Sequence, residues 1–599
     1  MMRVADYLVE TLSRKGLRDV FMVTGGGAMH LNDAFGRSSA FRVTCCHHEQ
    51  ACAMAAESYF RLSGRLAAVN VTTGPGGLNA LSGVHGAFTD SMGMVVVSGQ
   101  VKRETLVSWA GPAGLRQLGD QEADIVSIVR PLTKYAALVE HPDDIRYHLE
   151  KALYLATSGR PGPIWLDVPS DVQAAQVDPT SLRGFQAESV TKPDLAPRIA
   201  AFLDLVRQAK RPVLLPGSGI RIAGVEQAFR RLVERLRIPV ATAFNAHDLL
   251  EDSHPCLVGR PGTVGDRAGN FAVQNADLVI VLGCRLNIRQ IGYNWKTWAR
   301  AARKVMVDVD PLELVKPTLS VDLPIQADLR EFFAALEQQG WPEPVPEHEA
   351  YLRWCRERRD RYPVVLERHR VRSSPVNPYA FTEALFRHLP PGQAVVTGDG
   401  TACVATFQAA KLKEGQRLYS NSGCASMGYD LPASIGASVA QDRGPVVCLA
   451  GDGSLMMNLQ ELQTVAHHRL PILLVIYNNG GYHSIRQTQT TYFPDGLVGF
   501  DAATGVSFPD YARIAAAFDL PHRRVDRHED LDAALSESLA APWPRILEVM
   551  LDPAQPFEPK PSSRRLEDGR MVSAPLEDLA PFLSREELRS NMWIDPVGG

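Results

Sequence analysis

The sequence predicts an α/β protein made of three doubly wound domains, each with a parallel sheet between helices, followed by a C-terminal tail. Short β-branched runs alternate with longer segments whose apolar residues recur at helical spacing. At 599 residues the chain is too long for one hydrophobic core. Two polar, proline-containing stretches, 175–194 and 338–362, are predicted as linkers between the domains.

Ten apolar runs are predicted as strands, because a strand covered on both faces is apolar along most of its length. Helical patterns such as 224–236 and 459–469 separate them, which favours parallel pairing. The first 16 residues are predicted as an amphipathic helix. The predicted strands are 67–71, 94–97, 164–168, 212–215, 278–282, 304–309, 394–397, 446–450, 472–477 and 546–550.

The linkers define the expected domains. The first domain is expected at 1–174, the central domain at 195–335 and the third at 376–552. The remaining residues, 553–599, are rich in proline, serine and charge, and we expect a tail or lid with a short helix near 584–590.

The composition is that of a globular enzyme, with 45% hydrophobic and 22% charged residues. A formal charge of −4 gives no reason to expect nucleic acid or a membrane as partner. The sequence has no run of 18 apolar residues, and the first residues lack the apolar stretch of a signal peptide. We therefore expect a cytoplasmic protein.

The nine cysteines are an odd number without C-x-x-C spacing, which favours buried, reduced thiols. The adjacent pair Cys45 and Cys46 leaves a redox role open as an alternative. The apolar residues around the pair favour inert thiols.

A carboxylate and an amide follow two successive predicted strands of the third domain. Asp452 lies in GDGS after one strand, and Asn479 lies in NNGG after the next, 27 residues later. The carboxyl ends of neighbouring parallel strands meet at one sheet edge, where α/β folds bind ligands. Carboxylate and amide oxygens suit Mg²⁺, which completes its shell with diphosphate oxygens and water. The pair predicts a Mg²⁺–diphosphate site.

The glycines beside Asp452 let backbone N–H groups approach a phosphate at a helix N-terminus. The predicted phosphate-binding residues are Gly451, Gly453 and Ser454. The alternative is that both motifs are simple turns, but their joint position at strand ends favours the metal site. A second G-D-G at 398–400 has no Asn-Asn downstream, so we interpret it as a turn whose Gly400 lies near the cofactor.

The G-D-G…N-N pattern resembles the signature of thiamine-diphosphate (ThDP) enzymes. Residues 4–553 are similar to the acetolactate-synthase-like (acetohydroxyacid synthase) branch of that family. The resemblance implies that Asp452, Asn479 and the backbone carbonyl of Gly481 are the metal ligands. It also implies a homodimer or homotetramer, because in the family the cofactor lies between two chains.

The resemblance places further roles on this sequence. Glu49, in CCHHEQA, matches the activating glutamate, and Met427, in SGCASMGYDLPA, matches the large residue that bends the cofactor. The stretch TGPGGLN resembles the family's S-G-P-G-x-x-N loop, and GQV at 99–101 matches its G-Q-V. The remaining implied site residues are His48 and Gln121 for catalysis, and Gly26, Gly27, Thr73, Gly74, Pro75, Asn79 and Ser426 for cofactor binding.

The chemistry explains the importance of Glu49. A carboxyl group bonded to the aminopyrimidine favours the tautomer that can take the proton from the cofactor's reactive carbon. Positioned acid–base groups supply about 10²- to 10⁴-fold in rate. His47 and His48 fit positioning or core residues better than general bases.

The central domain carries a weaker signal for a dinucleotide. The glycine-rich PGSG, the acidic Asp308 and Asp328 and the basic GCRLNIR all follow or end predicted strands. Without G-x-G-x-x-G, an empty structural domain is an equally good interpretation. Arg285 and Arg289 match the family's G-x-R-x-x-x-R stretch, and this resemblance implies FAD.

The sequence departs from the true synthases on the acceptor side. Thr488 stands where they have tryptophan, and Gly93 stands where they have proline. A smaller, more polar acceptor side is expected. The GGGAMHL stretch and the tail are similar to homologues of polysaccharide and branched-sugar pathways.

We expect decarboxylation of a 2-keto acid, pyruvate, and transfer of the two-carbon unit to a carbonyl acceptor. Gly26 and Gly27 offer no proton donor, which favours transfer over aldehyde release. The acceptor remains open among a 2-keto acid, an aldehyde and a nucleotide-linked keto sugar. The alternatives are a 2-keto-acid decarboxylase or oxidase, and a non-enzymatic homologue that serves as a scaffold.

Overall fold

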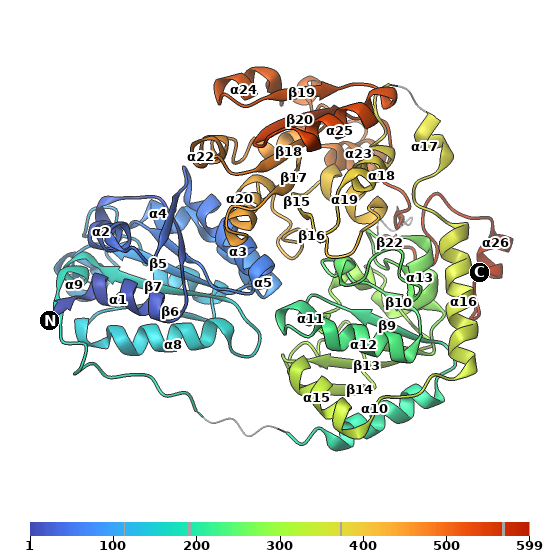
Figure 1. Ribbon diagram of the computed structural model, residues 1–599, viewed down its shortest axis with the longest axis horizontal. Helices are drawn as coiled ribbons and strands as arrows, with labels where there is room; N and C mark the ends of the chain where they lie inside the picture. Colours follow the sequence, from blue (N-terminus) through green and yellow to red (C-terminus); the bar gives the residue numbers. More distant parts are fainter. Residues whose placement is uncertain (113, 189–192, 372–373, 566–569, 598–599) are drawn as a thin grey trace.

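The computed structural model describes residues 1–112, 114–188, 193–371, 374–565 and 570–597. Three six-stranded sheets with helices on their faces make up most of the chain (Figure 1). The predicted linker 175–194 and the predicted tail 553–599 lie partly outside the described residues. Among the described residues, none of the helices is long and apolar enough to cross a membrane.

The N-terminal sheet is parallel throughout, because each strand returns to the same edge through a helix. Its strands, in spatial order, are β3 (Arg42–Cys45), β2 (Asp19–Met22), β4 (Ala68–Val71), β5 (Met94–Gln100), β7 (Pro163–Pro169) and β6 (Tyr135–Leu138). Its helices are α1 (Val4–Arg14), α2 (Met29–Arg37), α3 (Glu49–Ser63), α4 (Pro75–Asn79), α5 (Leu81–Asp90), α6 (Val107–Ala110), α7 (Ile125–Val129), α8 (Ile145–Thr157) and α9 (Ser170–Ala174). A short pair, β1 (Met2–Arg3) and β8 (Gln176–Val177), closes this part of the chain.

The C-terminal sheet repeats the same parallel topology. Its strands, in spatial order, are β16 (Arg417–Tyr419), β15 (Ala394–Thr397), β17 (Val446–Gly451), β18 (Ile472–Asn478), β20 (Arg545–Met550) and β19 (His522–Val525). Its helices are α18 (Pro378–His388), α19 (Thr401–Ala409), α20 (Asp430–Ala440), α21 (Asp452–Leu455), α22 (Glu461–His468), α23 (His483–Tyr492), α24 (Tyr511–Ala517) and α25 (Leu531–Ala540). In both sheets the first strand therefore lies between the second and the third.

The central sheet has a different order, 3-2-1-4-5-6, which is the order of dinucleotide-binding folds. Its parallel strands, in spatial order, are β11 (Leu257–Gly259), β10 (Val240–Ala241), β9 (Pro212–Pro216), β12 (Leu278–Leu282), β13 (Arg303–Asp308) and β14 (Leu323–Gln326). Its helices are α10 (Ala196–Gln208), α11 (Gly219–Ile222), α12 (Glu226–Leu236), α13 (Arg267–Gln274), α14 (Ile288–Ile291) and α15 (Leu329–Gln339). The predicted fold class is confirmed, and all ten predicted strands are present with ends that differ by three residues or fewer.

The linker prediction for 338–362 is wrong over most of its length. Residues Pro346–Arg361 form α16, which lies beside the central sheet, followed by the short α17 (Glu367–Val371) (Figure 1). Tyr351 and Cys355 are buried, and the Tyr351 hydroxyl donates to the Ala272 carbonyl at 2.7 Å. The many charges and flanking prolines of this segment resemble a linker, but a narrow apolar stripe suffices to attach the helix.

The tail joins the central domain. A hairpin of β21 (Ser563–Arg565) and β22 (Met571–Ser573) precedes α26 (Arg585–Ser590), close to the helix expected at 584–590. The buried Glu577 carboxylate pairs with Arg300 at 2.8 Å, and Trp593 meets Tyr351 edge-on. These contacts fix the end of the described chain on the central domain.

One hydrophobic cluster spans the N- and C-terminal sheets. Helix α3 lies along α20, and Gly436 of α20 faces the Ala55 carbonyl closely enough that a Cβ would lie 2.0 Å from its oxygen. Seven of the nine cysteines are buried, as predicted, and Cys424 is half-buried. Cys45 is exposed, so the prediction of a buried thiol is wrong for this residue.

Candidate functional site

The two sheets with matching topology each have a switch point, where successive connections leave in opposite directions. It lies between β2 and β4 in the N-terminal sheet and between β15 and β17 in the C-terminal sheet. Ligands of open α/β sheets bind beyond the carboxyl ends of the strands at such points. The predicted site residues follow these strands or their neighbours in the same two sheets.

Asp452 directly follows β17, and Asn479 directly follows β18. The two strands are neighbours in the sheet. Asp452 is 2% exposed, and its two carboxylate oxygens accept from the backbone N–H groups of Gly453 and Gly481, each at 2.8 Å. Burial raises the pKa of Asp452 to about 6, while these backbone bonds oppose that rise. The turn after β18 therefore folds back onto the carboxylate, as the proposed metal set requires.

The amide of Asn479 has one partner and one free oxygen. Its Nδ2 donates to Thr401 Oγ1 at 2.8 Å, whereas its Oδ1 is buried without a hydrogen-bond partner among the described residues. An unpartnered buried oxygen costs about 1–3 kcal/mol. A cation beside Asp452 would satisfy it, and a carboxylate with an amide oxygen suits a hard divalent ion. The residues present fit Mg²⁺.

The phosphate-binding candidates surround this pair. Gly451 precedes Asp452, while Gly453 and Ser454 lie in the first turn of α21. Gly400, at the N-cap of α19, has a φ of 77° and open space where a side chain would be. Thr401, the next residue, connects this turn to Asn479. The second G-D-G therefore lies beside the metal motif.

Glu49 begins α3, and His48 caps the helix. Glu49 is buried, with 8% of the residue exposed, and its Oε2 accepts from Asn79 Nδ2 at 3.0 Å. His48 Nδ1 accepts from the Gln50 N–H at 3.1 Å, which is the bond of an N-cap. The structure therefore gives His48 a capping contact, and it gives Glu49 a partner in the predicted T-G-P-G-G-L-N loop.

The remaining N-terminal candidates lie close to one another. The Gly27 N–H donates to Thr72 Oγ1 at 3.1 Å, and a Cβ on Gly27 would lie 1.9 Å from Thr73 Oγ1. Gly74, with a φ of 60°, approaches the Gln121 carbonyl so closely that a Cβ would lie 2.1 Å from its oxygen. The loops that contain Gly26, Gly27, Thr73, Gly74, Pro75, Asn79 and Gln121 are thus brought together at one edge.

Residues 420–429, between β16 and α20, form the active-site loop, which contains Ser426 and Met427. Ser426 Oγ accepts from Asn421 Nδ2 at 2.6 Å inside the loop. The Gly428 N–H donates to Ser454 Oγ at 2.9 Å. Met427 is therefore held next to the residue that ends the G-D-G-S motif.

The two groups of residues lie on different sheets. Two of the contacts that join these parts of the chain are made by neighbours of Glu49: Gln50 Oε1 accepts from Asn458 Nδ2 at 3.1 Å, and the His47 N–H donates to Glu461 at 3.0 Å. Exposed apolar side chains flank both groups. Leu78 lies beside Asn79, and Met456 and Met457 follow the metal motif, at 38% and 49% exposed.

A groove of about 290 Å³ opens over the switch point of the central sheet, between β9 and β12. Gly217 and Gly283, after these strands, touch: a Cβ on Gly217 would lie 2.3 Å from the Gly283 oxygen. Because neither residue has a side chain, backbone N–H groups are open to a phosphate at this point. Of the predicted residues, Arg285, Asp308 and Asp328 line the groove, together with Asn245, Ser422 and Asp90.

Arg289 lies beside the groove and does not line it. Its guanidinium lies over the Phe244 ring, with 5.0 Å to the centroid, and it is absent from the lining of the groove. Its charge instead faces Cys403 of α19, where it opposes the rise in the Cys403 pKa caused by burial. Arg285 therefore lines the groove, whereas Arg289 packs on Phe244.

Three sequence profiles of one family cover most of the chain. Those of the thiamine pyrophosphate enzyme N-terminal TPP binding domain, central domain and C-terminal TPP binding domain match residues 2–128, 199–336 and 398–549. The chain belongs to the thiamine pyrophosphate enzyme family. It is a ThDP-dependent enzyme of the acetolactate-synthase-like branch, and the predicted resemblance is confirmed.

Curated relatives of the ThDP family match along almost the whole chain. Acetolactate synthase 2, chloroplastic, of Brassica napus is 33% identical over 91% of this chain and 85% of its own length. The acetolactate synthase large subunit of Parasynechococcus marenigrum is 32% identical over 91% and 87%. Acetolactate synthase 1, chloroplastic, of Zea mays is 32% identical over 91% and 85%.

The sequence analysis missed several residues around this candidate site. Thr401 orients Asn479, and Asn458 contacts both Gln50 and the Gly428 carbonyl. The G-D-G-T sequence at 398–401 was a usable signal for Thr401. Asn245 and Asp90 come from other domains, and the sequence offered no signal for their contacts with the active-site loop.

Proposed function

We propose that this enzyme binds ThDP through Mg²⁺, decarboxylates a 2-keto acid, pyruvate, and transfers the two-carbon unit to a carbonyl acceptor. The observation that carries the proposal is the buried, unpartnered Oδ1 of Asn479 beside the buried carboxylate of Asp452. Together with the Gly481 carbonyl they would hold Mg²⁺, which would bind the diphosphate. When bound, the cofactor supplies a nucleophilic carbon for 2-keto acids.

Glu49 would hold and move a proton at the aminopyrimidine. Its burial supports this role, because the fold keeps bulk water away from the carboxyl group. Asn79 would orient it through the 3.0 Å bond. Met427 would support the bent cofactor, and residues 1–174 and 376–552 would serve as the pyrimidine- and diphosphate-binding domains.

Transfer is favoured over release of an aldehyde because Gly26 and Gly27 offer no side chain that could protonate the decarboxylated unit. The second candidate, a plain decarboxylase or oxidase, lacks such support. The acceptor classes remain a 2-keto acid, an aldehyde and a nucleotide-linked keto sugar. Thr488 is exposed on α23, which follows the Asn479 turn. Because threonine is smaller than the tryptophan of the true synthases, this position is compatible with a larger acceptor.

The enzyme would act as a homodimer or a dimer of dimers, with Glu49 of one chain facing the metal residues of the other. The exposed Leu78, Met456 and Met457 beside the two groups support this assembly, because a partner would remove their apolar surface from water.

The groove of the central domain would hold FAD in a structural role. The 3-2-1-4-5-6 strand order, the bare Gly217–Gly283 contact and Arg285 at the switch point support a dinucleotide there. Asp308 and Asp328 lie at the ends of β13 and β14, where they would meet ribose hydroxyls.

The test is pyruvate turnover followed by mass spectrometry, with and without each acceptor class. We expect a product heavier than the acceptor by an acetyl unit, together with loss of CO₂. Release of acetaldehyde or acetate in full yield, whichever acceptor is supplied, would contradict the transferase and support the decarboxylase or oxidase.

A further inference from the structure

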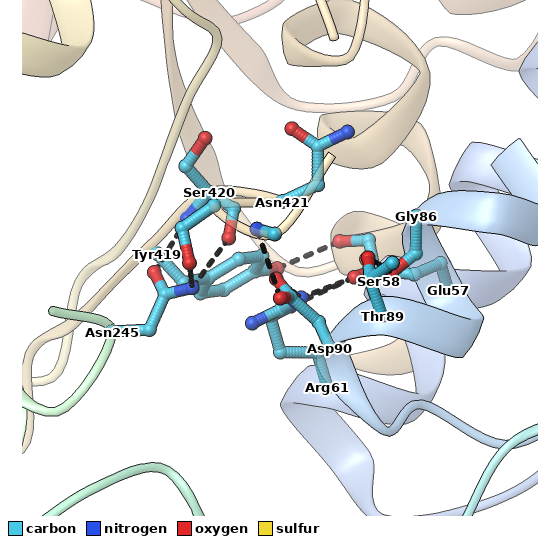
Figure 2. A network of polar contacts seen from close by, with 12 residues as sticks. Glu57, Ser58, Arg61, Gly86, Thr89, Asp90, Asn245, Tyr419, Ser420 and Asn421 are labelled. Atoms are coloured by element: carbon cyan, nitrogen blue, oxygen red, sulfur yellow. Dashed lines mark hydrogen bonds and ion pairs between the residues drawn. The ribbon is translucent and has the colours of Figure 1, made fainter. Parts of the chain in front are cut away.

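The active-site loop (residues 420–429) is held by three buried contacts that come from outside its own domain. At its start, Asn245 of the central domain binds it: Nδ2 donates to the Ser420 carbonyl at 2.7 Å and to Ser422 Oγ at 3.0 Å. Its Oδ1 accepts from the Ser420 N–H at 3.0 Å. All three described hydrogen bonds of the Asn245 amide are thus made to this loop, and Figure 2 shows Asn245 beside Ser420.

The N-terminal domain holds the loop at two further points. Asp90, at the end of α5, accepts from the Gly423 N–H at 2.9 Å. Glu57, on α3, accepts from the Tyr429 hydroxyl at 2.5 Å. Arg61 lies between the two carboxylates and pairs with both (Figure 2). Met427 lies between these fixed points.

The same loop reaches the central groove through Ser422, which lines the groove together with Asn245 and Asp90. Arg285, one of the arginines that line the groove, approaches Asp90 Oδ1 at 3.8 Å. Gly423 lies between them, since a Cβ there would lie 2.4 Å from Asp90 Oδ1 and 3.0 Å from Arg285 Nη2. A ligand in the groove would therefore touch the residues that position the loop.

The inner end of the loop binds the metal motif. The Gly428 N–H donates to Ser454 Oγ, and the Ser454 hydroxyl donates to Asp430, the first residue of α20. Ser454 is two residues from Asp452. A continuous set of described contacts thus connects the groove, through the loop, to the metal motif.

We propose that Asn245 and Asp90 are positioning residues for the cofactor site, and that a dinucleotide in the central groove raises the affinity for ThDP through the active-site loop. This inference rests on the proposed function and deepens it. An occupied groove holds Asn245 and Ser422 in place, so ThDP no longer has to order the loop when it binds. By thermodynamic linkage, ThDP must tighten the binding of the dinucleotide by the same factor.

Calorimetric titration of ThDP and Mg²⁺ into the full-length apoprotein, with and without saturating FAD, tests the proposal. We expect FAD to lower the Kd of ThDP at least about fivefold, the lower end of typical coupling. Flavin fluorescence should give the same factor for FAD with and without ThDP.

Two variants release the loop at opposite ends. Asn245→Asp removes both donated bonds, and Tyr429→Phe removes the bond to Glu57 from a residue outside the lining of the groove. Both should bring the ratio of the two Kd values close to one. Asn275→Asp is the matched control. Asn275 is also buried in the central domain, and it donates to the carbonyls of Phe271 and Asn591, away from the loop. The ratio in this variant should therefore stay at the wild-type value.

The outcomes separate the two claims. If both cofactors bind and the wild-type ratio is one, the coupling is wrong and the proposed function stands. If both loop variants keep the wild-type ratio, the assignment of the positioning residues is wrong. If FAD does not bind, the proposed flavin role is wrong and the coupling with it.

Discussion

Asn479 Nδ2 donates to Thr401 Oγ1 at 2.8 Å, and this bond decides which way the amide faces. With Nδ2 engaged, Oδ1 is the atom that has no hydrogen-bond partner among the described residues. Thr401 follows the second G-D-G, so a turn without a proposed metal ligand of its own orients the proposed ligand that follows β18. The loss of such an orienting contact around a metal site typically costs about 10- to 100-fold in metal affinity.

Thr401→Val should weaken Mg²⁺-dependent binding of ThDP by about 10- to 100-fold, the usual effect of losing an orienting partner. The measurement is the Kd of ThDP by calorimetry. Thr401→Ser retains the accepting hydroxyl and should bind like the wild type. An unchanged Kd in the valine variant would show that the bond does not orient the amide.

Glu49→Gln should reduce the turnover of pyruvate by about 10²- to 10⁴-fold, because the amide cannot move the proton at the aminopyrimidine. Its Kd for ThDP should change far less, since the diphosphate and Mg²⁺ contacts are intact. Steady-state kinetics and calorimetry on the same preparation check both statements. A variant with full turnover would remove Glu49 from the mechanism.

Met457→Glu should favour the monomer, because it places a charge on an exposed apolar side chain beside the metal motif that the proposed assembly buries. Light scattering over a range of protein concentrations measures the mass. Leu312→Glu is the matched control, since Leu312 is also exposed but lies in the central domain. A wild-type protein that is active as a monomer would overturn the assembly.

Tyr351→Phe should lower the free energy of unfolding of the central domain by about 0.5–1.5 kcal/mol, the net value of one hydrogen bond. The lost bond is the one to the Ala272 carbonyl that attaches α16. Thermal melting measures the effect, and Tyr293→Phe, at an exposed position, is the control. Equal melting of the two variants would mean that this bond adds nothing to the stability.

The strands were predictable because parallel strands are covered on both faces. The run at 278–282, for example, is entirely apolar and forms β12 without a change of ends. Helix α16 was missed for the converse reason. Its buried residues are few, and Arg358, Arg359 and Arg361 dominate its composition. Packing against α13 stabilises this helix, and composition alone does not reveal that contact.

The site divides in the same way. Asp452 and Asn479 could be predicted because each follows a strand, and strand ends of one sheet converge. Asn245 could not, since its partner Ser420 is 175 residues away in another domain. Asn245 also has a left-handed φ of 62°, which the folded chain imposes and the sequence does not reveal. Contacts between domains depend on how the sheets pack, and one sequence carries no periodic signal of that arrangement.

The most direct test of the central claim is the thermal melting of the apoprotein with ThDP and Mg²⁺. A ligand at 100 times its Kd that binds only the native state stabilises it by about 2.7 kcal/mol. We expect a higher Tm for the wild type with both added, and no shift for Asp452→Ala, which lacks the carboxylate for Mg²⁺. An unchanged wild-type Tm, or an equal shift in Asp452→Ala, would contradict the account.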